Sequence, residues 1–234
     1  MIRKIKRFAK NLMFIKRKIQ GGGNKIEILT ADFRGISISI CGEDNLVRVA
    51  SGTKIRNCRF LLNGNGNSVV ICGGSDFRGA EFTINGNGSH IKIGSGNDFS
   101  SGYDVFCVSG DGSQISVGER NLFAWGNHNL TAEGGTTLFV GDDCLFSNDI
   151  YVRTSDSHSI ISLATGKKLN SEKDVSIGNH VWIAPCVKIL KGASIQDGSV
   201  VGTGAVVTSA FSDKNVVIAG VPAKVVKKNI RWEK

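Results

Sequence analysis

Four histidines are the side chains of this sequence best suited to move a proton near neutral pH. They are His90, His128, His158 and His180. Their successive spacings of 38, 30 and 22 along the chain do not supply the two neighbouring ligands expected of a three-histidine zinc site. We therefore expect no metal, and we expect one histidine to act as a general base.

His158 is the strongest candidate because of its place in the chain. It precedes a polar stretch, residues 164–174, that interrupts a repeat. Such an interruption predicts an excursion loop over 159–174, and loops on a rigid scaffold often build functional sites. Position alone leaves an exposed loop histidine as the alternative. Asp156 precedes His158 by two residues and shares its face if the chain is extended, so it either orients the histidine or is a solvated carboxylate.

The six cysteines, at positions 41, 58, 72, 107, 144 and 186, form no CxxC motif. Their wide gaps argue against a disulfide framework or a zinc site. They fit small buried side chains in a reducing cytosol. Cys186 falls on an outward position, so a cysteine nucleophile beside a histidine is a second, weaker hypothesis.

The scaffold that would position these residues is repetitive. Short apolar units begin at Leu46, Val69, Ile91, Ile115 and Leu138, at successive intervals of 23, 22, 24 and 23 along the chain. Clusters of Gly and Asn separate the units, and both residue types tolerate the positive φ of tight corners. The sequence contains 30 glycines among 234 residues, which agrees with many corners. The pattern predicts an all-β parallel solenoid.

A finer period of six marks the C-terminal third. The aliphatic residues of this period are Ile177, Ile183, Ile189, Ile195, Val201 and Val207. Four residues after each of them comes a mostly smaller side chain, until Phe211 ends the run. Six residues per side fit a triangular coil with large aliphatics inside it. The period matches neither a helix nor a simple alternation, and the β-branched content disfavours a helix.

The positive charge is concentrated at the N-terminus. The net charge is +9, and residues 1–20 hold eight Lys and Arg and no acid, which leaves 9 − 8 = +1 for the rest. A nearly neutral body argues against nucleic-acid binding. Apolar residues at steps of three and four, from Ile5 to Ile19, predict an amphipathic helix over 1–20. It would lie on an anionic membrane or pack on the solenoid or its copies.

The N-terminus lacks the apolar core of a signal peptide. No apolar run has the length of a membrane-spanning helix. We therefore expect a cytoplasmic protein, with a peripheral contact at the inner face of the membrane through residues 1–20 as one option.

Three ordered motifs resemble the hexapeptide-repeat acetyltransferases, a family that includes sugar O-acetyltransferases of capsule and lipopolysaccharide. The motifs are IGNHVWI at 177–183, DGSVVGTGAVVT at 197–208 and AGVPAKVV at 219–226. The resemblance covers roughly residues 125–228. It implies a left-handed parallel β-helix, expected over 21–222 and followed by a basic tail over 223–234. Residues 21–120 show only solenoid character, so a right-handed β-helix stays open for them.

The same resemblance implies an activity. We expect an acetyl-CoA-dependent O-acetyltransferase that modifies a sugar hydroxyl of a bacterial surface polysaccharide or its precursor. It would be a homotrimer with a site between copies. The alternatives are an amino-sugar N-acetyltransferase on the same fold and a non-catalytic β-solenoid. A γ-class carbonic anhydrase is disfavoured by the histidine spacing.

The matched motifs also imply residue roles. The family's catalytic histidine sits in a Gly-His-Pro-like element, which corresponds to His158, although Ser157 and Ser159 replace the Gly and Pro. Trp182 would line the acetyl-CoA channel and border the acceptor. Asn127 matches an acceptor-binding asparagine, with a corner asparagine as the alternative. The neighbours of Asn127 are His128, expected in acceptor binding or packing, and Asn129, an alternative acceptor ligand.

The co-substrate acetyl-CoA would contact two further groups of residues. The small residues Ala184, Thr203, Gly204 and Thr208 stand at matching family positions and would let the pantetheine arm approach the backbone. The basic residues Lys224, Lys227 and Lys228 would meet the phosphates. Family members often carry Arg there, and a solvated basic tail is the alternative reading.

Overall fold

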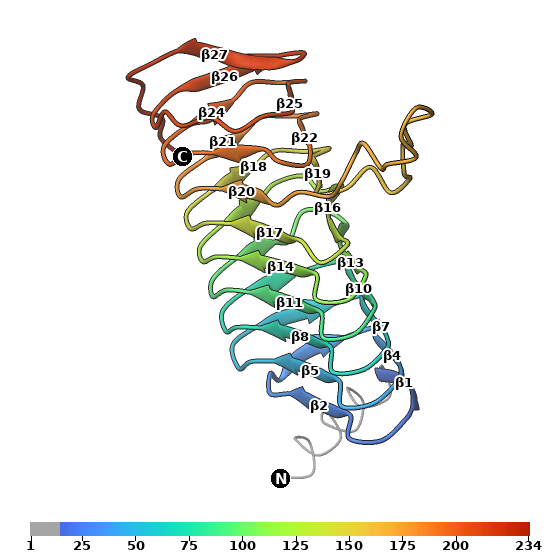
Figure 1. Ribbon diagram of the computed structural model, residues 1–234. Helices are drawn as coiled ribbons and strands as arrows, with labels where there is room; N and C mark the ends of the chain where they lie inside the picture. Colours follow the sequence, from blue (N-terminus) through green and yellow to red (C-terminus); the bar gives the residue numbers. More distant parts are fainter. Residues whose placement is uncertain (1–14) are drawn as a thin grey trace.

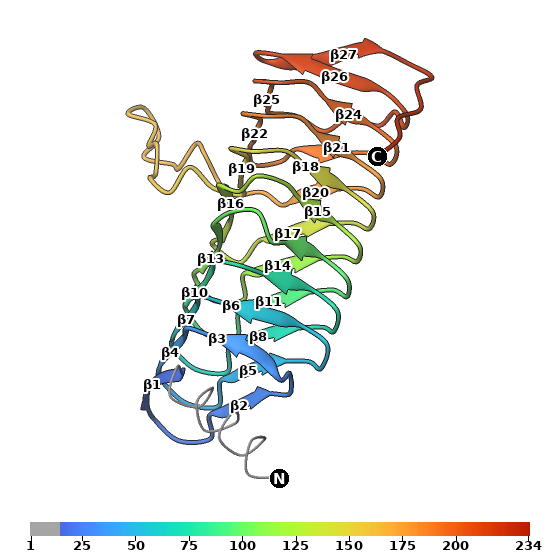
Figure 2. The same cartoon turned by 180° about the vertical axis from the view of Figure 1, so that it is seen from behind.

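The short apolar units form strands and the Gly- and Asn-rich clusters form corners of a parallel β-solenoid (Figures 1 and 2). The computed structural model describes residues 15–234. The chain passes through three sheets, here named A, B and C, in the same order on every turn. Sheet A has nine strands, which corresponds to about nine turns. The predicted all-β solenoid is confirmed.

The strands of each sheet stack along the solenoid axis. Sheet A contains β1 (Ile15–Gln20), β4 (Ile36–Cys41), β7 (Cys58–Asn63), β10 (Ala80–Asn85), β13 (Asp104–Ser109), β16 (His128–Glu133), β19 (Tyr151–Arg153), β22 (Lys188–Ile189) and β25 (Val206–Val207). Sheet B contains β2 (Lys25–Ile28), β5 (Leu46–Val49), β8 (Ser68–Ile71), β11 (His90–Ile93), β14 (Gln114–Val117), β17 (Thr137–Val140), β20 (Val175–Ile177) and β23 (Ser194–Ile195). Sheet C contains β3 (Asp32–Arg34), β6 (Lys54–Arg56), β9 (Asp76–Phe77), β12 (Asp98–Phe99), β15 (Leu122–Phe123), β18 (Leu145–Phe146), β21 (Trp182–Ile183), β24 (Val200–Val201), β26 (Val217–Gly220) and β27 (Ala223–Lys227).

The length of a turn changes along the chain, and sheet A accounts for the change. Cys58 pairs with Ala80, an offset of 80 − 58 = 22, whereas Lys188 pairs with Val206, an offset of 206 − 188 = 18. A six-residue strand such as β10 buries three side chains, whereas β22 spans only two residues. The same three sheets run unbroken through both regions. The winding therefore keeps one hand throughout.

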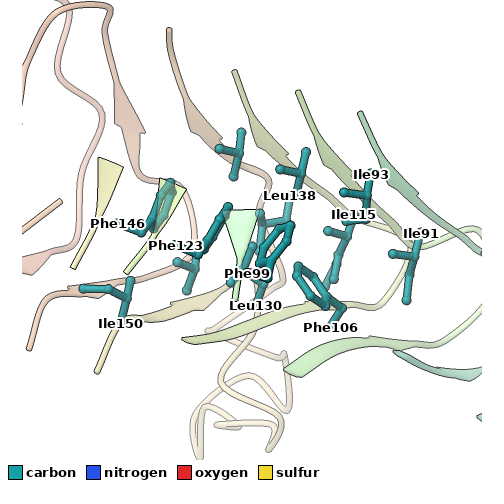
Figure 3. Packing of buried hydrophobic residues seen from close by; sticks show 14 of the residues in the cluster. Ile91, Ile93, Phe99, Phe106, Ile115, Phe123, Leu130, Leu138, Phe146 and Ile150 are labelled. Carbon is teal, nitrogen blue, oxygen red and sulfur yellow. The ribbon is translucent and has the colours of Figure 1, made fainter. Parts of the chain in front are cut away.

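Stacked phenylalanines fill the wider turns. Phe77, Phe99, Phe123 and Phe146 occupy equivalent inward positions of sheet C, with ring centroids 4.3 to 4.5 Å apart. Figure 3 shows the last three of these rings. A second stack, Phe60, Phe82 and Phe106, lines sheet A at 5.0 and 5.1 Å. All seven rings are fully buried. Truncating one of them to Ala would cost about 3–5 kcal/mol.

Stacked asparagine side chains form hydrogen bonds with backbone N–H and C=O groups at the corners of the coil. The side chain of Asn45 accepts from the backbone N–H of Asn67 at 2.9 Å, and Asn67 donates to the carbonyl of Gly86 at 2.8 Å. Asn97 and Asn121 repeat this arrangement at another corner. Because each amide bonds to the next turn, buried asparagines link successive coils without leaving unpaired groups.

The helix predicted for residues 1–20 is wrong where the structure describes it. Residues 15–20 form strand β1, which pairs in parallel with β4, so that Ile15 lies beside Ile36 and Ile19 beside Ile40. The solenoid therefore begins before residue 21. The earlier part of the predicted helix lies outside the described residues. Within residues 15–234, no helix is long and apolar enough to span a membrane.

Candidate active site

The chain leaves the coil between β19 and β20, at the corner where sheet A passes to sheet B. Residues 154–174 form an excursion that projects from the solenoid in both views (Figures 1 and 2). Its base is closed by a hydrogen bond of 3.0 Å from the N–H of Lys173 to the carbonyl of Thr154. Farther out, Ile161 and Lys168 form an antiparallel bridge. The excursion is thus a protruding hairpin-like loop with a fixed base.

His158 lies at the start of this excursion and is exposed. The Asn170 side chain fixes its backbone: Nδ2 donates to the carbonyl of His158 at 2.8 Å, and Oδ1 accepts from the N–H of Ile160 at 2.7 Å. The imidazole makes no hydrogen bond to the described residues. The residue is open to solvent.

Asp156 occupies a different position from the one expected for an orienting carboxylate. Its Oδ2 accepts from the ammonium of Lys191 at 2.5 Å and from Nδ2 of Asn170 at 2.8 Å. The hydrogen bond from Lys191 holds the pKa of Asp156 below its usual value. The carboxylate therefore contacts the backbone clamp of His158 through Asn170, and not the imidazole.

The side chain preceding His158 is bound to sheet A. Ser157 has a positive φ of 63°, and its Oγ donates to Glu133 Oε2 at 3.1 Å. The Arg153 guanidinium contacts the same hydroxyl and forms an ion pair with Glu133 at 3.0 Å. These three residues form a polar cluster at the sheet edge beside the histidine.

The three predicted acceptor residues point in different directions. Asn127 is exposed at the corner from sheet C to sheet A and donates to Asp149 at 3.0 Å. Asn129 lies on the outer face of sheet A and accepts from the Thr131 hydroxyl at 2.8 Å. His128 is inside the coil and only 1% exposed, so acceptor contact by His128 does not fit the structure, and the packing alternative does.

Both ring nitrogens of His128 lie within hydrogen-bonding distance of oxygen atoms inside the coil. Nδ1 lies 2.5 Å from Oδ1 of Asp104, and Nε2 lies 2.6 Å from the carbonyl oxygen of Ser147. Burial raises the pKa of Asp104, and the hydrogen bond from His128 opposes that effect. The second carboxylate oxygen of Asp104 is buried without a partner among the described residues. This pair belongs to the interior, beneath Phe123 and Phe146.

The residues predicted to bind acetyl-CoA come one after another along successive coils. Trp182 projects from β21 on the outer face of sheet C, with Nε1 3.4 Å from the Ser147 hydroxyl. Ala184 is buried at the next corner. Thr203 and Gly204 lie one coil later, where Gly204 is exposed and its N–H donates to the carbonyl of Pro185 at 2.9 Å. Thr208 is exposed directly after β25.

The C-terminal segment is not a free tail. Residues 223–227 form β27, which pairs antiparallel with β26 and carries Lys224 and Lys227. Lys228 forms an ion pair with Asp213 at 2.7 Å. The chain then folds back along the solenoid, as Figure 1 shows by the C-terminus lying beside β21.

Trp232 fixes this returning segment. Its indole stacks on His180 with centroids 4.1 Å apart and donates to the His180 carbonyl at 2.9 Å. The indole of Trp182 lies 6.1 Å away. A shallow depression there is lined by Asp143, His180, Arg231, Trp232, Glu233 and Lys234. It contains none of the predicted site residues, so we do not assign the reaction to it.

The geometry separates the two halves of the expected site. His158 lies at the corner between sheets A and B, whereas Trp182 lies on sheet C. In a three-sided coil, that corner is on the opposite side of the core from sheet C. Within one chain, the histidine and the tryptophan therefore face different directions.

Sequence reasoning missed four residues that hold the site: Glu133, Arg153, Asn170 and Lys191. Each acts across a sheet register or across the excursion, as with the 35 residues that separate Asp156 from Lys191. Contacts of this kind leave no local pattern. Only Asn170, within the polar stretch after His158, stood in a segment already marked as unusual.

Comparison with known proteins agrees with this architecture. Residues 174–209 match the family described as bacterial transferase hexapeptide, six repeats. This part of the chain is therefore similar to the hexapeptide-repeat transferases. The matched stretch begins where the excursion returns to the coil and contains Trp182, Ala184, Thr203, Gly204 and Thr208.

Several acetyltransferases are similar over part or most of the chain. A polysialic acid O-acetyltransferase of Neisseria meningitidis is 34% identical over 107 residues, which are 46% of this chain and 50% of the relative. A galactoside O-acetyltransferase of Escherichia coli is 36% identical over 44% of this chain and 50% of its own. The chain thus spans about half the length of these relatives. The crystal structure of the polySia-specific acetyltransferase NeuO shares the fold, with a TM-score of 0.68 and 24% identity over 95% of this chain and 90% of that one.

Proposed function

We propose that this protein transfers an acetyl group from acetyl-CoA to a hydroxyl of a sugar, in a bacterial surface polysaccharide or its precursor. The observation that carries the proposal is the placement of an exposed histidine on an excursion that leads directly into the hexapeptide repeats. The names of the relatives, which act on polysialic acid and on galactosides, support a sugar acceptor.

The chemistry assigned to His158 is general base catalysis. The neutral imidazole accepts the proton of the sugar hydroxyl as the oxygen attacks the thioester carbonyl. The tetrahedral intermediate then collapses, the C–S bond breaks, and the CoA thiolate takes the proton from the imidazolium. The products are an acetyl ester and free CoA. Asn127 and Asn129 are the proposed acceptor ligands.

We assign acetyl-CoA to the outer surface near Trp182. Ala184, Thr203, Gly204 and Thr208 would border the pantetheine arm. Lys224, Lys227 and Lys228 would attract the phosphates, although Lys228 must first release Asp213. The winding is proposed to be left-handed, as in the family, against the usual right-handed preference of parallel crossovers.

The active assembly is proposed to be a homotrimer. His158 and Trp182 face different sides of one chain, so a second copy must bring a tryptophan to each histidine. Cyclic packing of three solenoids would do this with one repeated interface. The three interfaces would then form three equivalent sites.

The test is a thiol assay of CoA release with acetyl-CoA and a panel of sugars, nucleotide sugars and anionic capsule polymers. Turnover with one glycan, giving a product whose acetyl group is removed by mild alkali, supports transfer to oxygen. An alkali-stable product would instead show transfer to an amino-sugar nitrogen. If no glycan supports turnover and acetyl-CoA does not bind by calorimetry, the proposal is wrong and a non-catalytic solenoid is favoured.

A further inference from the structure

Ser157 forms an unusual turn immediately before His158. Its φ is 63°, and the N–H of His158 donates to the carbonyl of Asp156 at 2.8 Å. A hydrogen bond that closes around one central residue with positive φ defines the rarer form of the γ-turn, which is strained. Eleven other non-glycine residues within 15–234 also have a positive φ, so the hydrogen bond from His158 to Asp156 is what distinguishes this turn. The backbone therefore reverses sharply at Ser157, directly before His158.

The Ser157 hydroxyl holds this turn against sheet A. It donates to Glu133 Oε2 at 3.1 Å and contacts the guanidinium of Arg153. Its backbone N–H donates to Ser155 Oγ at 2.8 Å. Both the backbone N–H and the side-chain hydroxyl of Ser157 therefore form hydrogen bonds. A glycine at this position would keep the first bond and lose the second.

The partners of Ser157 are themselves held firmly. The side chains of Glu133 and Arg153 are only 20% and 22% exposed and pair at 3.0 Å. Arg153 also donates to the Tyr151 hydroxyl at 2.7 Å, and its guanidinium carbon lies 5.6 Å from the centre of that ring. Glu133 ends β16 and Arg153 ends β19, which are neighbouring strands. The cluster is therefore part of the rigid scaffold.

We infer that Glu133, Arg153 and Ser157 are positioning residues, which set the direction of the His158 imidazole by holding the γ-turn. Strained backbone that its surroundings enforce is concentrated at functional sites. Here the strain lies one residue from the exposed histidine. The inference deepens the proposed acetyl transfer and rests on it for its consequence in catalysis.

Two substitutions of Ser157 separate the turn from the hydroxyl. Ser157→Ala and Ser157→Gly both remove the hydroxyl, but only Gly adopts positive φ without a steric penalty. We expect Ser157→Ala to lower kcat by about 10-fold, since small displacements of a catalytic group are costly. Ser157→Gly should be less impaired than Ser157→Ala, because glycine adopts the positive φ freely, but it should stay below wild type, because it lacks the hydroxyl that bonds Glu133. The KM for acetyl-CoA should stay unchanged in both. Ser159→Ala, on the other side of His158, is the matched control.

A second readout is independent of turnover. The imidazole Cε1–H NMR signal of His158 is assigned by its loss in His158→Ala. We expect Ser157→Ala and Glu133→Gln to move this signal, and Ser157→Gly to return it toward the wild-type position. An unmoved signal together with an unchanged kcat in Ser157→Ala and in Glu133→Gln overturns the inference. A wild-type protein without turnover would reject the proposed acetyl transfer, whereas the NMR comparison would still decide the positioning role.

Discussion

The ammonium of Lys191 donates a hydrogen bond of 2.5 Å to the carboxylate of Asp156, which lies two residues before His158. Lys191 also donates to the carbonyl of Asn170 at 2.9 Å, and Asn170 in turn holds the backbone of His158. Lys191, in the coil after the excursion, thereby bonds both the outgoing segment of the excursion at Asp156 and its returning segment at Asn170. This arrangement makes Asp156 an anchor of the loop.

The anchoring role predicts coupled effects of Asp156→Asn and Lys191→Met. Each should lower kcat a few-fold, and the loss in the double variant should be smaller than the sum of the two single losses, because both substitutions remove the shared hydrogen bond between Asp156 and Lys191. A pair that is partly exposed should couple by about 0.5–1 kcal/mol in unfolding free energy. Additive losses in a double-mutant cycle would show that the two residues act separately. Lys188→Met, at an exposed position on the same strand edge, is the control.

The same pair predicts a pH dependence. The hydrogen bond from Lys191 lowers the pKa of Asp156 in the folded protein. A carboxylate with a lowered folded pKa stabilises the fold above its unfolded value of about 4 and loses that contribution as pH falls through the folded value. The stability difference between wild type and Lys191→Met should therefore shrink in acid. Thermal unfolding from pH 6 down to about pH 3 measures it, and a difference that grows in acid would contradict this assignment.

The buried pair of His128 and Asp104 predicts a large cost on disruption. His128→Ala leaves a carboxylate inside the coil without its partner, so unfolding should become about 3–5 kcal/mol easier. Replacing both residues by Leu should recover part of that loss, since an apolar pair leaves no uncompensated charge. Urea unfolding gives the comparison, with the outward-facing Asn129→Ala as the neutral control. If His128→Ala and Asn129→Ala were equally stable, the interior placement would be refuted.

The returning C-terminal segment predicts a role for Trp232 in holding the surface around Trp182. Trp232 is only 7% exposed and stacks on His180. We expect Trp232→Ala to raise the KM for acetyl-CoA several-fold and to lower the melting temperature. Its neighbour Arg231, whose side chain is 84% exposed, gives the matched control Arg231→Ala, which should change neither. A normal KM for acetyl-CoA in Trp232→Ala would show that the C-terminal segment does not contribute to the acetyl-CoA binding surface.

The separation of His158 from Trp182 predicts complementation between copies. His158→Ala and Trp182→Ala should each be nearly inactive alone. After unfolding and refolding as a one-to-one mixture, about a quarter of the interfaces in a cyclic trimer should combine an intact histidine with an intact tryptophan. CoA release near that fraction of wild type supports a site shared between copies. A mixture as inactive as its components would contradict it.

The repeating scaffold could be read from the sequence because inward residues recur at a fixed period. The aliphatic residues from Ile177 to Val207 recur every six residues, which directly indicates that each side of the coil is six residues long. The stacked phenylalanines were also within reach, since Phe77, Phe99, Phe123 and Phe146 recur at intervals of 22, 24 and 23 along the chain. The inward position of His128 agrees with its alternation with Leu130 in β16, a signal that is equally present in the sequence.

Other features depended on contacts that no local pattern encodes. Ile15 and Ile19 are four residues apart, which satisfies a helix and also one face of a strand, and pairing with β4 decides for the strand. The expected contact of Asp156 with His158 assumed an extended chain. The positive φ of Ser157 reverses the chain between them, so the two side chains do not share a face.

The most direct test of the central claim is the rate of CoA release by His158→Ala at saturating acetyl-CoA and acceptor. His90→Ala, which removes an imidazole bound to Ser68 on sheet B, is the control. Loss of a general base predicts a fall in kcat of about 10²-fold or more for His158→Ala, with His90→Ala unchanged. A His158→Ala protein that turns over at the wild-type rate would contradict the account and assign the proton transfer to another group.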